Sequence, residues 1–417
     1  MRMISALRCP AIALLWLGQA FSAVGDEIYR VGLTWLAVGI VGANAGYLAA
    51  GQSAALMFLS LFAGHWADHW APLKTMIRTD LLRGVIVLVP VFISYFSPPS
   101  MLVIWSVAIP LAALGAFFDP ALQSVLPRYA PSVDVLRATN GLMGTTFRIA
   151  RLIGPLLVGL LAGIIPMIHF FSLDAFSFLI SAICIFSVRN FPQAKKTSDH
   201  SPPPSTGNFL QSMQQNYNLV CREKGLDFVF LSKALTGCTW SLLFLSLTLL
   251  IRDIVAASPE LHAAATATKI FGLVIAAYGF GNLLGVLFFG NIPRRRAYLT
   301  MYCGYAFFSF GFFAIAMAPT IKLIMVACAF AGFFGPMNDL GFIDLMQKIF
   351  PFSQMARVFR FRIAVETAAT LALMLCAPEI LRHFSPRPVM FAGGIVWLLM
   401  AILGFSHRGA KLFEVES

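Results

Sequence analysis

Charged residues are scarce in this sequence. Asp, Glu, Lys and Arg make up only 12% of its 417 residues, whereas apolar residues make up 59% and the mean hydropathy is +0.81. About a quarter of the residues of an ordinary globular domain are charged, so this composition excludes a soluble protein and equally a disordered one. The apolar runs are continuous over about 20 residues instead of alternating over about ten, which argues against an outer-membrane β-barrel.

Catalytic and metal-binding signatures are missing as well. The seven cysteines have no metal-ligand spacing and five of them stand singly inside apolar runs, which favours buried apolar filler over a disulfide framework. No nucleophile elbow, zincin motif or P-loop occurs. We therefore expect a protein that is not an enzyme or an ATP-driven pump and that has no cofactor.

Apolar segments of membrane-spanning length are abundant. We predict an all-α polytopic membrane protein with twelve transmembrane helices in two six-helix pseudo-repeat bundles. The predicted domains are a bundle at 1–190, a cytoplasmic linker with a surface helix at 191–227 and a second bundle at 228–417. The predicted spans are 10–38, 46–66, 76–96, 101–125, 141–164, 167–188, 229–251, 268–290, 297–317, 321–346, 358–381 and 388–406.

The two halves contain similar motifs. Phe117-Phe118-Asp119-Pro120, which we place at the end of the fourth span, recurs as Phe333-Phe334-Gly335-Pro336 at the end of the tenth. Between the halves, the stretch 195–205 is polar and rich in proline and serine, as in a flexible linker. Apolar residues then recur with helical spacing over 209–220, which predicts a helix on the cytoplasmic surface.

Basic residues fall on alternate connections. The formal net charge is +12, which in a soluble protein would suggest nucleic acid. In a membrane protein, short connections rich in Lys and Arg face the cytoplasm. We therefore expect no nucleic-acid partner, and we place the protein in the cytoplasmic (inner) membrane with both termini in the cytoplasm. The basic connections contain Lys74, Arg78, Arg128, Arg137, Lys195, Lys196, Arg222, Lys224, Arg294, Arg295, Arg296, Arg357, Arg360 and Arg362.

Several motifs in the first half resemble the major facilitator superfamily, and within it the subgroup of macrolide efflux proteins and enterobactin exporters. Gly64-His65-Trp66-Ala67-Asp68, followed by Lys74 and by Asp80-Leu81-Leu82-Arg83, is similar to the gating motif after the second span of that family. His69 and Ala71 depart from the pattern, which usually has Arg and Gly there. The resemblance implies that Gly64, Asp68, Lys74 and Arg83 act as a latch for rocking of the halves.

The fifth predicted span carries the most specific resemblance. Its Arg151-Leu152-Ile153-Gly154-Pro155, followed by Gly159, is similar to the antiporter motif of the family. Glycine and proline inside a membrane helix allow close helix approach and a bend. The alternative is that these are ordinary packing glycines.

Ionisable residues at membrane depth are costly, about 2.5–3.5 kcal/mol each, and so are functional candidates. Asp26 and Arg30 are i, i+4 neighbours that we expect to pair, which would leave Glu27 without a partner and able to exchange a proton in a cavity of low dielectric. Asp174, Asp339 and Glu366 are further candidates for a proton-coupling or substrate site. A structural ion pair at Asp26 and Arg30, a structural role for Asp174 and a cytoplasmic position for Asp339 and Glu366 are the alternatives.

Metal binding is disfavoured. His65 and His69 have the i, i+4 spacing of zinc ligands, but they lie at a cytoplasmic helix end inside the gating motif, so we predict no metal site.

Three functional hypotheses remain. The first is a monomeric, proton-coupled secondary exporter of a small amphipathic molecule, either a drug such as a macrolide or a siderophore, with protons and the lipid bilayer as its other partners. The second is an importer with the same fold, for a siderophore or another nutrient. The third is a non-transporting sensor or scaffold, which the density of charge inside the spans disfavours. Export rests on the resemblance alone.

Overall fold

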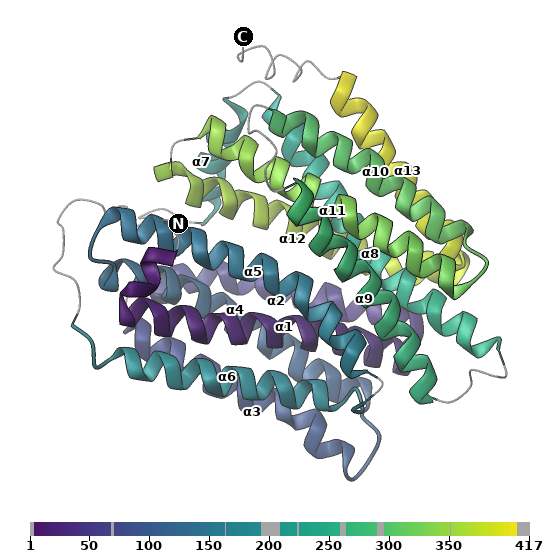
Figure 1. Cartoon of the computed structure of the whole chain (residues 1–417), viewed down its shortest axis with the longest axis horizontal. Helices are drawn as coiled ribbons and strands as arrows, with labels where there is room; N and C mark the ends of the chain where they lie inside the picture. Colours follow the sequence, from purple (N-terminus) through teal and green to yellow (C-terminus); the bar gives the residue numbers. More distant parts are fainter. Residues whose placement is uncertain are drawn as a thin grey trace. The chain divides into compact units, whose positions relative to one another are not determined.

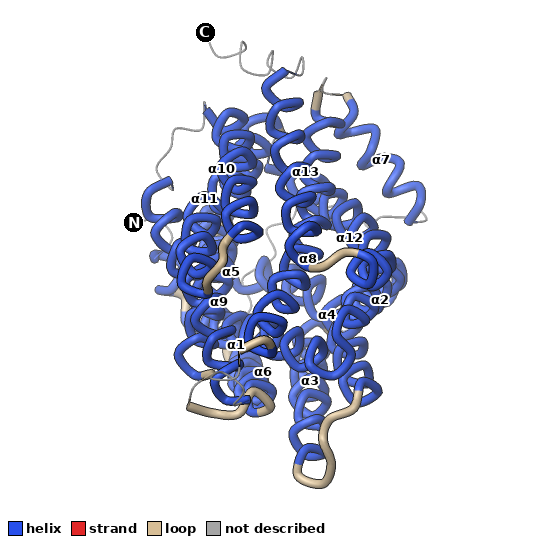
Figure 2. The backbone as a smooth tube through the Cα atoms, turned by 90° about the vertical axis from the view of Figure 1, so that its right-hand side faces the viewer, coloured by secondary structure: helices blue, strands red, loops and turns tan. Residues whose placement is uncertain are grey.

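A computed structural model describes residues 4–67, 71–162, 164–192, 209–222, 225–258, 264–289, 296–350 and 352–406. These residues form helices and short connections, with no strand among them (Figure 2). Twelve of the helices have 20 residues or more, as the predicted fold class requires. They are α1 (Pro10–Val41), α2 (Ala45–Ala67), α3 (Pro72–Ser94), α4 (Met101–Tyr129), α5 (Val133–Leu161), α6 (His169–Val188), α8 (Leu226–Ala256), α9 (Ala264–Phe289), α10 (Ala297–Met317), α11 (Ile321–Ile349), α12 (Phe352–His383) and α13 (Pro386–Ser406).

Long apolar helices are the expected form of this sequence in a bilayer, because a helix satisfies its backbone polar groups internally. Nine stretches of the described residues are long and apolar enough to cross a membrane, and one of them, Pro10–Leu59, runs from α1 into α2. Charged residues inside α3, including Asp80 and Arg83, keep that helix out of this set. Two short 3-10 helices, η1 (Ile4–Arg8) and η2 (Gly42–Asn44), precede α1 and α2.

The shorter helix α7 (Phe209–Cys221) lies where the spacing of apolar residues predicts a surface helix. Asn216 and Val220 are buried, and the Tyr217 ring lies 6.3 Å from the ring of Phe361 in α12. This helix therefore packs on the second half of the chain. The polar stretch predicted as a linker at 195–205 falls outside the described residues.

Several helices extend beyond the predicted spans. Pro120 and Pro336 lie inside α4 and α11 and do not end those helices, because polar residues continue the helix past the apolar run. In the same way Arg357, Arg360 and Arg362, predicted in a connection, lie in the first three turns of α12. Polar overhangs of this kind cannot be separated from loops by hydropathy alone.

The chain divides into two compact units. The first consists of Met1–Ile40, Ala54–Val158 and Ile164–Pro204, and the second of Val41–Ser53, Gly159–Gly163 and Ser205–Ser417. In the first unit α3 packs against α4 and α6, and in the second α11 packs between α9 and α10 while α13 packs on α8 and α10 (Figure 1). The prediction of domains at 1–190, 191–227 and 228–417 remains a proposal.

Candidate functional site

A three-residue charge cluster in the first unit joins α1 to α5. Glu27 on α1 accepts hydrogen bonds from Nε (2.9 Å) and Nη2 of Arg30, one turn further along the same helix. Its other carboxylate oxygen lies 3.7 Å from Nε of Arg151 on α5. The Glu27 side chain is only 14% exposed, whereas those of Arg30 and Arg151 are 47% and 68% exposed. A nearly buried carboxylate is thus held by two accessible guanidinium groups.

Gly154 makes room for this cluster. A Cβ at Gly154 would overlap the Cβ of Glu27, so only glycine lets α5 approach α1 closely enough for Glu27 to reach Arg151. The motif predicted from sequence and the charges predicted from sequence therefore belong to one site. No sequence signal connected them, because the contact joins helices more than 100 residues apart.

The predicted pairing of Asp26 with Arg30 is wrong. Arg30 pairs with Glu27 at i, i+3 spacing, and i, i+3 and i, i+4 residues are both neighbours on a helix. Asp26 is exposed and has no hydrogen bond or ion pair within the described part of the chain. Asp26 interacts electrostatically with Arg83 and with four other carboxylates, Glu27, Asp80, Asp119 and Asp174. Asp26, and not Glu27, is the carboxylate without a direct partner.

A second group of carboxylates in this unit is fully buried. Asp80 on α3 and Asp174 on α6 are 0% exposed, and Arg83 is the cation nearest to Asp80, with 3.7 Å between Nη1 and Oδ1. The Ser177 hydroxyl lies 3.4 Å from Oδ1 of Asp174. Both oxygens of Asp80 and Oδ2 of Asp174 have no hydrogen-bond donor in the described structure. Unsatisfied buried carboxylate oxygens are rare, so this group is a candidate for binding protons or internal water.

Arg83 is built into the packing of the first unit. Its guanidinium carbon lies 4.9 Å from the ring centre of Phe118 on α4 and 5.5 Å from that of Phe178 on α6. The resemblance places Arg83 in the gating motif with Gly64, Asp68 and Lys74, but Arg83 lies inside α3 and is buried. Lys74 is exposed in the first turn of that helix. Such cation–π contacts suit a fixed structural arginine.

The structure describes the other residues of the gating motif and of the antiporter motif only in part. Gly64 lies in α2 and Pro155 in α5, without a described side chain, and Asp68 lies outside the described residues. Gly159 belongs to the second unit, where an added Cβ would lie 2.5 Å from the carbonyl oxygen of Gly272. The absence of a side chain at Gly159 therefore lets the end of α5 pack closely against the backbone of α9.

The second unit contains a charge cluster that sequence analysis missed in part. Lys233 on α8 is buried, and its Nζ lies 2.5 Å from Oδ1 of Asp339 and 3.1 Å from Oδ1 of Asn338, both on α11. Asp339 was predicted as a candidate, but its partner was not. The available signal was a lysine inside the apolar run of the seventh predicted span, because a buried ammonium group requires a counter-charge.

Glu366, the remaining predicted carboxylate, belongs to the same region. On α12 its Oε1 accepts a hydrogen bond of 2.8 Å from Nε of Arg362. Both Arg362 and Lys233 face the ring of Phe342, at 5.1 Å and 6.0 Å from its centre. The unit thus holds two ion pairs around one aromatic ring, and both acids are already neutralised by a cation.

Substitution of Asp339 tests the importance of the buried ammonium group. We expect Asp339→Asn to lower the free energy of unfolding by about 3 kcal/mol, because removing one partner leaves a buried charge uncompensated. The double variant Lys233→Met/Asp339→Asn should recover most of this loss. Unfolding in mixed micelles measures both values, and a double variant as unstable as Asp339→Asn would show that the pair itself is not responsible.

Metal binding has no support in the described residues. No group of three or more His, Cys, Asp or Glu side chains there could hold a metal ion. His65 and His69, the sequence candidates for zinc, have no described side chain.

The sequence of the chain is similar to those of known transporters. Residues 15–361 match the sequence model of the Major Facilitator Superfamily. The chain is 26% identical over 399 residues to the multidrug efflux pump Tap of Mycolicibacterium fortuitum, with 90% of each chain covered. It is 23% identical over 376 residues to an uncharacterized MFS-type transporter, y4rN, of Sinorhizobium fredii, with 87% of each covered.

The fold is also similar to that of solved transporters. The crystal structure of the POT family transporter PepTSo aligns with a TM-score of 0.70 at 13% identity and covers 98% of this chain and 99% of that one. An auto-inhibited POT family peptide transporter aligns with a TM-score of 0.65 at 13% identity, with 98% and 97% covered. At this identity the likeness concerns the fold alone.

Proposed function

Because the chain belongs to the Major Facilitator Superfamily and is therefore a multi-pass membrane transporter, we propose that it exports a small amphipathic compound in exchange for protons. Export is supported by relatives named multidrug efflux pumps, in Mycolicibacterium fortuitum and, at 25% identity over 347 residues, in Mycobacterium tuberculosis. A drug such as a macrolide and a siderophore are the two cargo classes. The transport step needs no enzymatic chemistry.

The observation that carries the proposal is the unequal pairing of two adjacent carboxylates. Glu27 is held by Arg30 and Arg151, whereas Asp26 is accessible and has no direct partner in the described chain. A carboxylate at membrane depth without a direct ion pair can exist in the neutral form more readily than a paired one. Asp26 is therefore the group that exchanges a proton, and Glu27 with its arginines fixes the position of α1 against α5.

In this mechanism the proton and the compound compete. The compound binds when Asp26 is ionised, and a proton taken up from the side of lower pH displaces it. Access alternates between the two sides of the cytoplasmic membrane, with both chain termini in the cytoplasm, and the Gly64, Asp68 and Lys74 motif acts as the latch between states.

Transport in everted membrane vesicles tests the proposal. Vesicles with an acid interior, loaded with a pH-sensitive dye, are challenged with macrolides, lipophilic dyes and siderophores. We expect at least one compound to accumulate inside while the proton gradient falls, and vesicles without the protein to show neither effect. Accumulation with no proton movement, or only when the gradient is reversed, would contradict proton-coupled export.

A further inference from the structure

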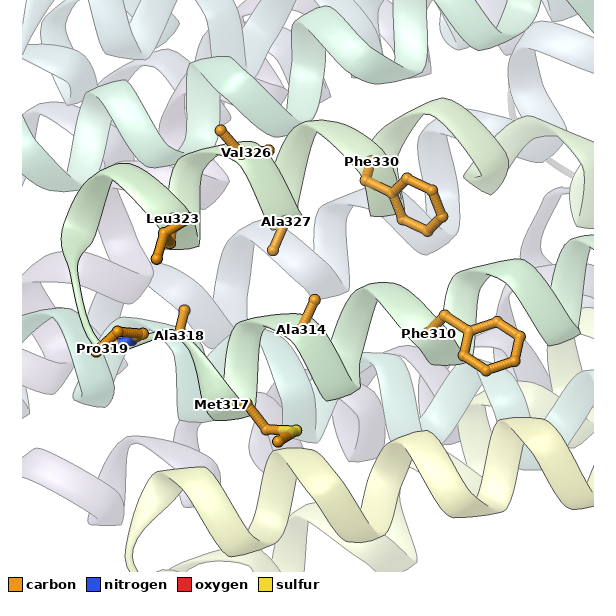
Figure 3. A pocket seen from close by; sticks show the side chains of 9 residues that line it. All are labelled: Phe310, Ala314, Met317, Ala318, Pro319, Leu323, Val326, Ala327 and Phe330. Atoms are coloured by element: carbon orange, nitrogen blue, oxygen red, sulfur yellow. The ribbon is translucent and has the colours of Figure 1, made fainter.

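An apolar groove of about 520 Å³ runs between α10 and α11 in the second unit. The residues that line it include Phe310, Ala314 and Met317 from α10 and Leu323, Val326 and Phe330 from α11 (Figure 3). The groove extends from the turn at Ala318–Pro319 to the two phenylalanines (Figure 3). From Leu323 to Phe330 the helical rise gives it a length of about 10 Å.

The larger side chains of the lining are exposed, whereas Ala318 and Ala327 at its floor are buried. Met317 is 73%, Val326 66% and Leu323 50% exposed. An exposed apolar surface of this kind marks a contact with another molecule. Both helices are apolar enough to span a membrane, so hydrocarbon is the medium against which the groove lies.

The end of the groove at the turn is positively charged. Arg387, in the first turn of α13, donates hydrogen bonds from Nη1 to the carbonyl oxygens of Ala316 (2.8 Å) and Ala318 (2.7 Å), which fixes its guanidinium group beside the turn. Lys322 is exposed and directly precedes the lining residue Leu323. Within the described chain neither cation has a carboxylate partner.

The first turn of α11 adds to this positive charge. Thr320 caps the helix, and its hydroxyl accepts a hydrogen bond from the backbone N–H of Leu323. The amides at the start of a helix carry the positive end of the helix dipole, which favours an anion. The apolar groove thus begins at the turn that Arg387 binds, near the N-terminus of α11 and Lys322 in its first turn.

We propose that this groove binds one anionic phospholipid, with an acyl chain along α10 and α11 and the phosphate beside Lys322 and Arg387. The positive charge of Lys322 and Arg387 favours an anionic headgroup, and the apolar lining favours a hydrocarbon chain over a polar molecule. This site is independent of proton exchange at Asp26. It lies entirely within the second unit and involves none of the residues of the transport proposal.

Lipid retention by the purified full-length protein tests the site. Native mass spectrometry would compare phosphatidylglycerol with phosphatidylcholine of the same chain length. We expect one long-lived phosphatidylglycerol adduct in the wild type and none with phosphatidylcholine. Lys322→Gln should weaken it about fivefold, the loss expected for one basic residue near anionic lipid. Ala314→Phe, at an exposed position inside the groove, should abolish it.

The control is Ala392→Phe, which adds the same bulk at an exposed alanine of α13 outside the groove lining and should keep the adduct. Thermal unfolding in lipid-free detergent verifies that each variant is folded. An adduct that persists in Ala314→Phe, or equal retention of both lipids by the wild type, would overturn the proposal. Because the assay involves no transport, its failure would leave the exporter proposal intact.

Discussion

Asp26→Asn should abolish gradient-driven accumulation of the transported compound and weaken compound binding, because the neutral amide resembles the protonated aspartate from which the compound is displaced. If one proton is exchanged per compound, a gradient of one pH unit drives about tenfold accumulation. Asparagine has nearly the same shape as aspartate but cannot exchange a proton, so the compound should only equilibrate across the membrane. Asp26 is exposed and makes no direct ion pair in the described structure, and the buried Arg83 that interacts with it keeps Asp80 at 3.7 Å.

The measurement compares two assays on the same reconstituted protein. Accumulation under a proton gradient should fall to equilibrium in Asp26→Asn, whereas exchange of labelled for unlabelled compound without a gradient should continue at compound concentrations that fill the weakened site. Glu379→Gln is the matched control, since Glu379 is an exposed carboxylate that pairs with Arg382 and His383 at the end of α12. Full accumulation by Asp26→Asn, together with loss of accumulation in Asp174→Asn, would show that a buried carboxylate and not Asp26 exchanges the proton.

Gly285→Ala should lower the free energy of unfolding by about 3 kcal/mol. A Cβ at Gly285 of α9 would overlap the backbone carbonyl oxygen of Phe333 on α11, and a backbone atom cannot move aside as a flexible side chain can. Gly281 meets Ala329 in the same way, and Gly332 of α11 meets Tyr278. Three glycines thus set the α9–α11 contact, since membrane helices associate through packing and without a hydrophobic driving force.

Gly335→Ala provides the comparison. It also replaces a helical glycine by alanine, but its Cβ would have ordinary contacts of 3.5 Å with Phe308 and Tyr278. The gain in helix propensity, about 1 kcal/mol in water, is common to both variants and cancels in their difference. Reversible unfolding in mixed micelles should give a stable Gly335→Ala and an unstable Gly285→Ala. Equal stabilities would show that the two helices can separate at little cost.

The helices could be predicted from the sequence because bilayer thickness fixes how long an apolar run must be. The predicted span 297–317 coincides with α10, and α7 begins at the predicted residue. Errors occur where helices continue past the apolar run, as at 352–357, which precede the predicted span 358–381 but belong to α12.

The candidate site was predictable only as a set of residues. Mid-span charge and the glycine-proline motif indicate Glu27, Arg151 and Gly154 separately, but their contact depends on which faces of α1 and α5 meet. Both Asp26 and Glu27 have a helical spacing that allows a pair with Arg30, so the sequence alone could not show that Glu27 is the partner. Lys233 shows the same limit, because its partners are more than 100 residues away in the sequence.

Proton release on compound binding tests the central claim most directly. The purified protein, in weakly buffered detergent solution at a pH where compound binding is half-maximal, is mixed with a compound found active in vesicles, and a pH indicator records the protons released. If the compound displaces a proton from Asp26, the wild type releases up to about one proton per bound compound and Asp26→Asn releases none. Equal proton release by the two proteins, at equal binding, would contradict the assignment of proton exchange to Asp26.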